Sequence, residues 1–203
     1  MQSPHKPHSC VGLLLAAGYG RRYGSDKRKA RLPAGTPLLL ASLRAAEAVM
    51  DEVWVVLRPE DDLEDLALAG HTRIVRCEHA HHGMGSSLAC GVQTISQASD
   101  AKALMLLLGD MPWIRPGTLE TLLAGATEDS IVVPVADGQR GHPVIFGRHF
   151  WSDLLTLQGD QGARGIIERH PQAVVRMKVD DAGVILDVDT PHALGGCRGE
   201  TPL

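Results

Sequence analysis

The segment Val11-Gly-Leu-Leu-Leu-Ala-Ala-Gly18-Tyr-Gly-Arg-Arg-Tyr-Gly24 joins an apolar run to a loop rich in glycine and arginine. A short run that is apolar throughout is typical of a strand buried on both faces, as in a parallel sheet covered by helices. The glycines that follow let the backbone approach a ligand closely and offer its N–H groups to phosphate oxygens. The segment therefore predicts a buried first strand, residues 11–16, that leads into an anion-binding loop.

The remainder of the chain alternates short apolar runs with amphipathic stretches. We expect further strands at 53–57, 73–76, 104–108, 131–135, 143–146, 174–179 and 184–188. We expect helices at 37–50, 59–69, 85–95, 117–126, 151–157 and 163–169. Such alternation predicts an α/β, three-layer fold with a mostly parallel central sheet. We predict one domain over residues 11–195, between tails at 1–10 and 196–203.

Positive charge is concentrated in one place on an otherwise acidic chain. The net charge of the 203 residues is -4, whereas a nucleic-acid-binding domain is usually basic overall. The clustered cations are Arg21, Arg22, Lys27, Arg28, Lys29 and Arg31. Local clustering of this kind favours a small anionic ligand such as a polyphosphate. A solvated basic loop is the alternative interpretation.

Cysteine usage and hydropathy predict a cytoplasmic protein that has no membrane segment. The four cysteines form no Cys-x-x-Cys pair, which is typical of reduced thiols in the cytosol. The chain contains no apolar stretch of the roughly 18 residues that a membrane helix needs, and no secretory signal at residues 1–10.

Two common phosphate-binding motifs are absent from the glycine-rich loop. A Walker loop needs Gly-Lys-Ser/Thr, and the chain contains no Gly-Lys pair. A dinucleotide fingerprint needs Gly-x-Gly-x-x-Gly, but the spacing from Gly18 to Gly24 is one residue too long. A nicotinamide-dependent oxidoreductase is therefore disfavoured. A serine hydrolase is disfavoured as well, because the chain has no Gly-x-Ser-x-Gly elbow.

Acidic residues follow the buried strand at 104–108 and recur near the end of the chain. Asp110 follows that strand after Gly109, and Asp187 and Asp189, at the end of the expected strand 184–188, would face the same side of an extended chain. Ligands of such sheets bind at the carboxyl ends of the strands, and Mg²⁺ takes one or two carboxylates together with phosphate oxygens. These residues therefore predict a Mg²⁺ site. Asp110 and Asp189 could instead cap turns or helices.

Two further segments are candidate ligand contacts. Gly83-Met-Gly85-Ser86-Ser would open a helix with free N–H and hydroxyl groups for a base, a sugar or a phosphate, or would simply cap the helix. Cys77-Glu-His-Ala-His-His82 contains possible metal ligands, but no matching ligand set stands elsewhere in the chain. We interpret that second segment as a polar surface loop.

Nine segments together resemble one family. They are Leu15-Ala-Ala-Gly18, Arg22-x-Gly24, the lysine that follows, Pro37-Leu38, Gly83-Met-Gly-Ser-Ser87, Leu108-Gly-Asp-Met-Pro112, Arg140-Gly-His-Pro143, Gly159-Asp-x-Gly-Ala-Arg164 and Asp187-Val-Asp-Thr-Pro191. Their order resembles that of the molybdenum cofactor cytidylyltransferases (MocA-like) within the MobA-like NTP transferase family. The pair Ala16-Ala17 is similar to the cytidylyl branch, whereas Ala-Gly is typical of the guanylyl branch.

This resemblance implies an activity. It implies a Rossmann-like nucleotidyltransferase fold that binds CTP with Mg²⁺ and transfers CMP to the terminal phosphate of molybdopterin, with release of pyrophosphate. A molybdoenzyme of the xanthine dehydrogenase class would receive the product. Alternatives of the same fold are a guanylyltransferase and a sugar- or alcohol-phosphate cytidylyltransferase. A further alternative is a carrier of the cofactor that performs no chemistry.

The resemblance also implies roles for single residues. Arg22 and Lys27 would grip the triphosphate, and Asp110 and Asp189 would hold Mg²⁺. Lys29 competes with Lys27, because counting forward from Gly24 selects Lys27 whereas counting back from Pro33 selects Lys29. The remaining implied contacts are backbone groups of Ala16, Ala17 and Gly18 to the nucleotide, Gly85 and Ser86 to the base or sugar, and His142 and Arg164 to the molybdopterin.

Overall fold

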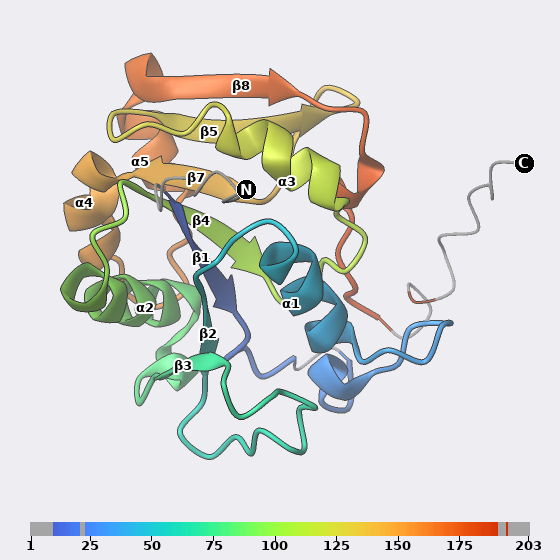
Figure 1. The fold of residues 1–203 in the computed structure, drawn as a ribbon. Coiled ribbons are helices and arrows are strands. Elements are labelled where there is room, and N and C mark those ends of the chain that lie inside the picture. Colours follow the sequence, from blue (N-terminus) through green and yellow to red (C-terminus); the bar gives the residue numbers. More distant parts are fainter. Residues whose placement is uncertain (1–9, 21–22, 191–193, 195–203) are drawn as a thin grey trace, which may run out of the picture.

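The computed structural model describes residues 10–20, 23–190 and 194, and its centre is a mixed eight-stranded sheet (Figure 1). The strands are β1 (Cys10–Leu15), β2 (Val53–Leu57), β3 (Arg73–Arg76), β4 (Ala103–Leu108), β5 (Ile131–Ala136), β6 (Gln139–Arg140), β7 (Val144–Gly147) and β8 (Val174–Lys178). Their order is β3-β2-β1-β4-β7-β5-β6, with β8 paired to β5. Helices cover both faces of the sheet, so the predicted α/β three-layer class is confirmed.

The two most apolar strands, β1 and β4, lie side by side in the middle of the sheet. Leu13 is paired with Trp54 of β2 on one side and with Leu106 of β4 on the other, and both pairings are parallel. Leu13 and Leu104 are completely buried, as expected for strands that are covered on both faces. Because β1, β2 and β4 are parallel, the segments that follow them meet at one edge of the sheet.

One strand, β7, is antiparallel to its neighbours and lies between β4 and β5. The reversal begins at the hairpin that joins β5 to β6. Asp137 and Gly138 both have positive φ there, 49° and 75°, as a two-residue type I′ turn requires. After the short strand β6 the chain returns beside β4, which makes the sheet mixed while the strands nearest the N-terminus stay parallel.

The helices form two layers that bury separate cores. The α-helices are α1 (Leu38–Glu47), α2 (Met84–Ala98), α3 (Pro116–Leu123), α4 (Trp151–Leu155) and α5 (Arg164–Arg169), and the short 3-10 helices that matter below are η1 (Lys27–Lys29) and η5 (Ala182–Ile185). Helices α1 and α3 pack on one face of the sheet, and α2, α4 and α5 pack on the other. Within the described residues, no helix has the length and apolar character needed to cross a bilayer.

Residues 59–69, which were predicted to be helical, form a series of turns. The prediction rested on acidic residues that would suit a first helical turn. Instead, the Asp61 carboxylate accepts hydrogen bonds from the backbone of Arg58 and from the side chain of Arg28. Ala67 has φ 57°, outside the right-handed helical region. Tertiary hydrogen bonding by Asp61 has therefore replaced the local helix.

Residues 184–188 were also predicted wrongly, because they do not form the expected strand. The 3-10 helix η5 covers Val184 and Ile185, and residues 186–190 belong to no helix or strand. The backbone still makes specific bonds, because His142 N donates to Val184 O (2.8 Å) and Val188 N donates to Asp110 O (3.0 Å). The apolar side chains of Val184 and Val188 are fully buried, whereas Leu186 between them is exposed, so burial explains only these two valines of the apolar run.

Candidate active site

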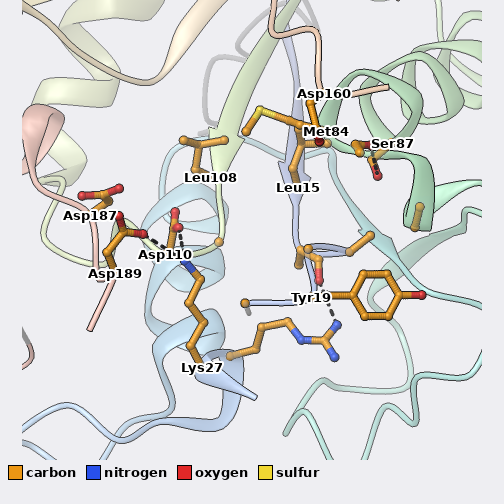
Figure 2. A pocket seen from close by; sticks show the side chains of 18 of the residues that line it. Leu15, Tyr19, Lys27, Met84, Ser87, Leu108, Asp110, Asp160, Asp187 and Asp189 are labelled. Atoms are coloured by element: carbon orange, nitrogen blue, oxygen red, sulfur yellow. Dashed lines mark hydrogen bonds and ion pairs between the residues drawn. The ribbon is translucent and has the colours of Figure 1, made fainter. Parts of the chain in front are cut away.

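A cavity of ≈ 530 Å³ lies at the carboxyl edge of the parallel strands (Figure 2). Its walls come from the loop after β1, the turn after β4, the start of α2, the 3-10 helix η1 and the segment after η5. Segments far apart in the sequence thus converge where the topology of the sheet predicts a ligand.

One end of the cavity holds a cluster of carboxylates with a lysine among them. Oxygen atoms of Asp110, Asp187 and Asp189 all lie within 4.8 Å of one another. Lys27 Nζ donates to Asp110 Oδ2 at 2.6 Å and lies 3.8 Å from Asp189 Oδ1 (Figure 2). The cluster therefore combines three acidic groups with one ammonium group, and it would gain from a further positive charge.

Backbone hydrogen bonds hold the carboxylates in place. Gly109 N donates to Leu15 O of the neighbouring strand at 3.0 Å, so the turn that carries Asp110 continues the pairing of β4 with β1. Val188 N donates to Asp110 O at 3.0 Å and its side chain is fully buried. Because Val188 lies between Asp187 and Asp189, this bond places the backbone of both aspartates beside Asp110.

The electrostatics of the cluster suit a divalent cation. Partial burial, together with the nearby Asp189 and Asp110 carboxylates, raises the pKa of Asp187 above its ordinary value. The part of this pKa shift that comes from Asp189 and Asp110 reflects repulsion between like charges, which a metal ion would relieve. Carboxylate oxygens are also the donors that hard divalent cations prefer. The three residues therefore fit such an ion, with room in the cavity for phosphate oxygens.

The loop after β1 forms the floor of the cavity and has unused backbone donors. Ala16, Ala17 and Gly18 line the cavity together with Tyr19. Among the described residues, none accepts a hydrogen bond from the N–H groups of Ala17, Gly18 or Tyr19. Ordered N–H groups without an acceptor are typical of anion-binding loops.

The basic run does not act as one block of charge. Lys27 enters the carboxylate cluster, whereas Lys29 pairs with Asp65 on the surface at 3.0 Å. Arg28 is buried, with only 5% of its surface exposed. Arg31 donates to Gly35 O in a neighbouring turn. Arg21 and Arg22 lie outside the described residues, so the assignment of Arg22 to the triphosphate stays a prediction.

The start of α2 lines the cavity on the side away from the carboxylate cluster (Figure 2). Ser87 lies in this lining, whereas Ser86 does not. The Ser86 hydroxyl accepts from Gly159 N at 3.1 Å. Gly85 N donates to Gly159 O at 2.8 Å, and a Cβ at Gly85 would lie 2.5 Å from Gln161 O. Gly85 and Ser86 therefore hold the neighbouring loop, and their contact with a base or sugar stays a prediction.

The two residues expected on the molybdopterin side lie outside the cavity lining. His142 Nδ1 is buried without a hydrogen-bond partner in the described part of the chain. Burial lowers the pKa of His142, against the opposing charges of Asp110 and Asp187. Arg164 faces solvent, with 86% of its side chain exposed, and pairs with Glu168. Their roles stay predictions.

The structure brings both Asp187 and Asp189, which the sequence offered as candidates, to Asp110, and it adds residues that the sequence analysis did not assign. Asp160 and Met84 line the cavity near the start of α2. Arg58 follows β2 directly and donates to carbonyl groups of the loop after β1. Ligand-binding residues of such sheets follow the parallel strands. Because Arg58 follows β2, the same rule applied to β2 would have identified Arg58 from the sequence.

These features define an α/β protein with a cavity at the carboxyl edge of its sheet, lined by a loop with unused N–H groups and by an acidic cluster that fits a divalent cation. The model of the MobA-like NTP transferase domain matches residues 12–174. The chain therefore belongs to the MobA-like NTP transferase family, and it is a nucleotidyltransferase by that membership.

Three similar proteins illustrate the family. The purine catabolism protein PucB of Bacillus subtilis (strain 168) is 30% identical over 201 residues, 95% of each chain. Rv0371c of Mycobacterium tuberculosis H37Rv has a TM-score of 0.81 at 27% identity, covering 93% of this chain and 96% of its own, and it has also been crystallised with manganese. The 2-C-methyl-D-erythritol 4-phosphate cytidylyltransferase of Corynebacterium diphtheriae is 34% identical over 143 residues, 63% of this chain and 57% of its own.

Proposed function

We propose that this protein transfers CMP from CTP to the terminal phosphate of molybdopterin, with release of pyrophosphate. The observation that best supports this proposal is the set of groups that line the cavity. Unused N–H groups of the loop after β1 and the carboxylate cluster with Lys27 line the same cavity. A triphosphate could therefore bind the loop while its reacting phosphate lies near the cluster.

In this proposal the residues of the chain bind and orient, and none acts as a nucleophile. The attacking group is a phosphate, which carries its own negative charge. The N–H groups of Ala17, Gly18 and Tyr19 would bind phosphate oxygens, and Lys27 would neutralise charge on the departing pyrophosphate. Positioning and charge neutralisation supply most of the catalysis in phosphoryl-type transfers.

A divalent metal ion, which we propose to be Mg²⁺, would be held by Asp110 with Asp187 and Asp189. The ion would polarise the α-phosphoryl group when bound. The manganese complex of the M. tuberculosis relative supports the use of a divalent cation in this fold. In this proposal the three aspartates hold the divalent metal ion next to Lys27.

Two observations support the particular substrates. The Ala16-Ala17 pair is similar to the cytidylyl branch of the family, and one relative of the chain is named as a cytidylyltransferase. The relative PucB is named as a purine catabolism protein. Xanthine is a purine, so a molybdoenzyme that oxidises it would act in purine breakdown and would need a finished cofactor. We therefore propose a xanthine dehydrogenase-class enzyme as the recipient.

The first experiment is calorimetric titration with CTP, GTP, ATP and UTP, each with and without Mg²⁺. Mg²⁺-dependent binding of CTP, followed by pyrophosphate release on addition of molybdopterin, would support the proposal. A preference for GTP would assign the protein to the guanylyl branch. Binding of molybdopterin without pyrophosphate release in the presence of CTP would favour a carrier and contradict the enzyme.

A further inference from the structure

Three consecutive carbonyl groups of the loop after β1 accept hydrogen bonds from arginine side chains. Arg28 Nη1 donates to Ala16 O at 2.8 Å. Arg58 Nε donates to Ala17 O at 3.2 Å, and Arg58 Nη2 donates to Gly18 O. These two arginines therefore determine the orientation of three successive peptide groups in the floor of the cavity.

Asp61 joins the two arginines into one unit. Its carboxylate accepts from Arg28 Nη1 and Nη2 at 2.5 and 2.6 Å, and from the backbone N of Arg58 at 2.9 Å. Asp26 accepts from the same guanidinium through Nε and Nη2, at 2.8 and 2.6 Å. Two bidentate carboxylate contacts fix the plane of a guanidinium group, so Arg28 has little freedom to turn toward a ligand.

Arg58 is held in a second way. Its guanidinium carbon lies 4.1 Å from the centre of the Tyr19 ring, which belongs to the same loop. A cation over an aromatic ring is attracted by the negative face of the ring. The loop is therefore contacted by Arg58 through two carbonyl oxygens and one ring.

The planar trans geometry of the peptide group determines where the N–H groups of this loop point. In a trans peptide the C=O and N–H bonds point in opposite directions. Because the carbonyl groups of residues 16–18 point at the arginines, the N–H groups of Ala17, Gly18 and Tyr19 point away from them. These N–H groups have no acceptor among the described residues.

We propose that Arg28 and Arg58 are positioning residues that hold these three N–H groups ready for the phosphates of the nucleotide. They act through the backbone of the loop rather than by gripping the triphosphate, which is the role that their positive charge first suggests. This inference rests on the proposed function, since it takes the nucleotide to bind in this cavity. Asp61 completes the unit through the side chain of Arg28 and the backbone N–H of Arg58.

The test uses Arg58→Met, because Arg58 is only partly buried and its loss leaves the buried Arg28 pairs intact. The probe is inorganic tripolyphosphate with Mg²⁺, titrated calorimetrically into the full chain. We expect tripolyphosphate to bind at least about tenfold more weakly, which corresponds to one lost hydrogen bond to a charged group. Arg58→Lys should give an intermediate affinity, because an ammonium group cannot reproduce the fork that reaches two carbonyls.

Arg73→Met is the matched control. Arg73 also stacks on an aromatic ring, at 5.5 Å from Trp54, and pairs with Glu52, but it makes no contact with the loop after β1 in the described structure. Binding of Mn²⁺ to the carboxylate cluster provides a second readout. A positioning role leaves Mn²⁺ affinity unchanged in Arg58→Met, whereas general distortion of the site lowers it.

Several results would contradict the positioning role of Arg58. Unchanged tripolyphosphate binding in Arg58→Met, an equal loss in Arg73→Met, or a parallel loss of Mn²⁺ binding would overturn the inference. Wild-type protein that binds no tripolyphosphate would overturn it as well. If wild-type protein binds tripolyphosphate but no nucleoside triphosphate, the proposed function fails, and the comparison of variants still decides the role of Arg58.

Discussion

Replacement of Lys27 by methionine should strengthen the binding of a divalent metal in the absence of nucleotide. Lys27 Nζ lies 2.6 Å from Asp110 Oδ2. A metal ion held about 2.1 Å from that oxygen would lie no more than about 4.7 Å from the ammonium nitrogen. At that distance the repulsion between charges of +2 and +1 is about 1.8 kcal/mol even with the full dielectric screening of water.

This repulsion predicts an increase in Mn²⁺ affinity of about 20-fold for Lys27→Met. The assay is calorimetric titration of Mn²⁺ at low ionic strength, where screening by salt is weakest. Nucleotide affinity should fall in the same variant, because Lys27 would no longer neutralise the triphosphate. Lys29→Met is the control, since Lys29 pairs with Asp65 on the surface and should leave both affinities unchanged.

Mn²⁺ affinity that stays the same or falls in Lys27→Met would refute this reasoning. It would mean that the lysine does not compete with the metal, or that Asp110 is not a ligand. A loss of nucleotide affinity in Lys29→Met alone would instead select the other register of the basic run.

Three further predictions concern the site and its surroundings. Asp110→Asn should abolish turnover with the thermal unfolding curve retained, because a lost metal carboxylate costs on the order of several kcal/mol of transition-state stabilisation; wild-type rates of pyrophosphate release would contradict the metal assignment. Burial alone would raise the pKa of Asp61, but the hydrogen bonds from Arg28 and from the backbone of Arg58, together with the charges of both arginines, outweigh it and lower the pKa below its ordinary value of 3.8. The destabilisation by Asp61→Asn should therefore be constant between about pH 5 and 8 and shrink below about pH 4, as the native carboxylate is protonated; an undiminished difference in melting temperature at low pH would count against the ion pair. Burial raises the pKa of Cys90 to about 12. Its thiol should therefore be alkylated far more slowly at neutral pH in the folded protein than in the unfolded chain. Equal alkylation rates, measured by mass spectrometry, would contradict a raised pKa for this thiol.

Local sequence predicts the parallel half of this molecule well. Runs such as Leu104–Leu108 can be buried on both faces only in the middle of a covered sheet, and β4 lies there. The order of strands then brings Asp110 to the edge of the sheet where ligands bind. These inferences succeed because hydrophobic burial acts on the residues of one short segment at a time.

The inaccurate predictions concern residues whose partners are distant in sequence. The acidic residues of 59–69 suit a helix by themselves, but Asp61 bonds to Arg28, 33 positions away. The basic run gives no indication that Arg28 is buried while Lys27 faces the cavity. Asp187 and Asp189 were placed on a strand that does not form, and they reach Asp110 through the backbone bond of Val188 instead. Local propensity contains none of this information.

The hydrogen bond from Val188 N to Asp110 O also has a consequence for synthesis of the protein. A chain is synthesised from its N-terminus onward, and every strand of the sheet has been translated once residue 178 has been added. At that moment Asp187 and Asp189 are still absent. The three carboxylates can therefore meet only after the residues of all eight strands have been synthesised, so the cluster cannot guide the formation of the sheet.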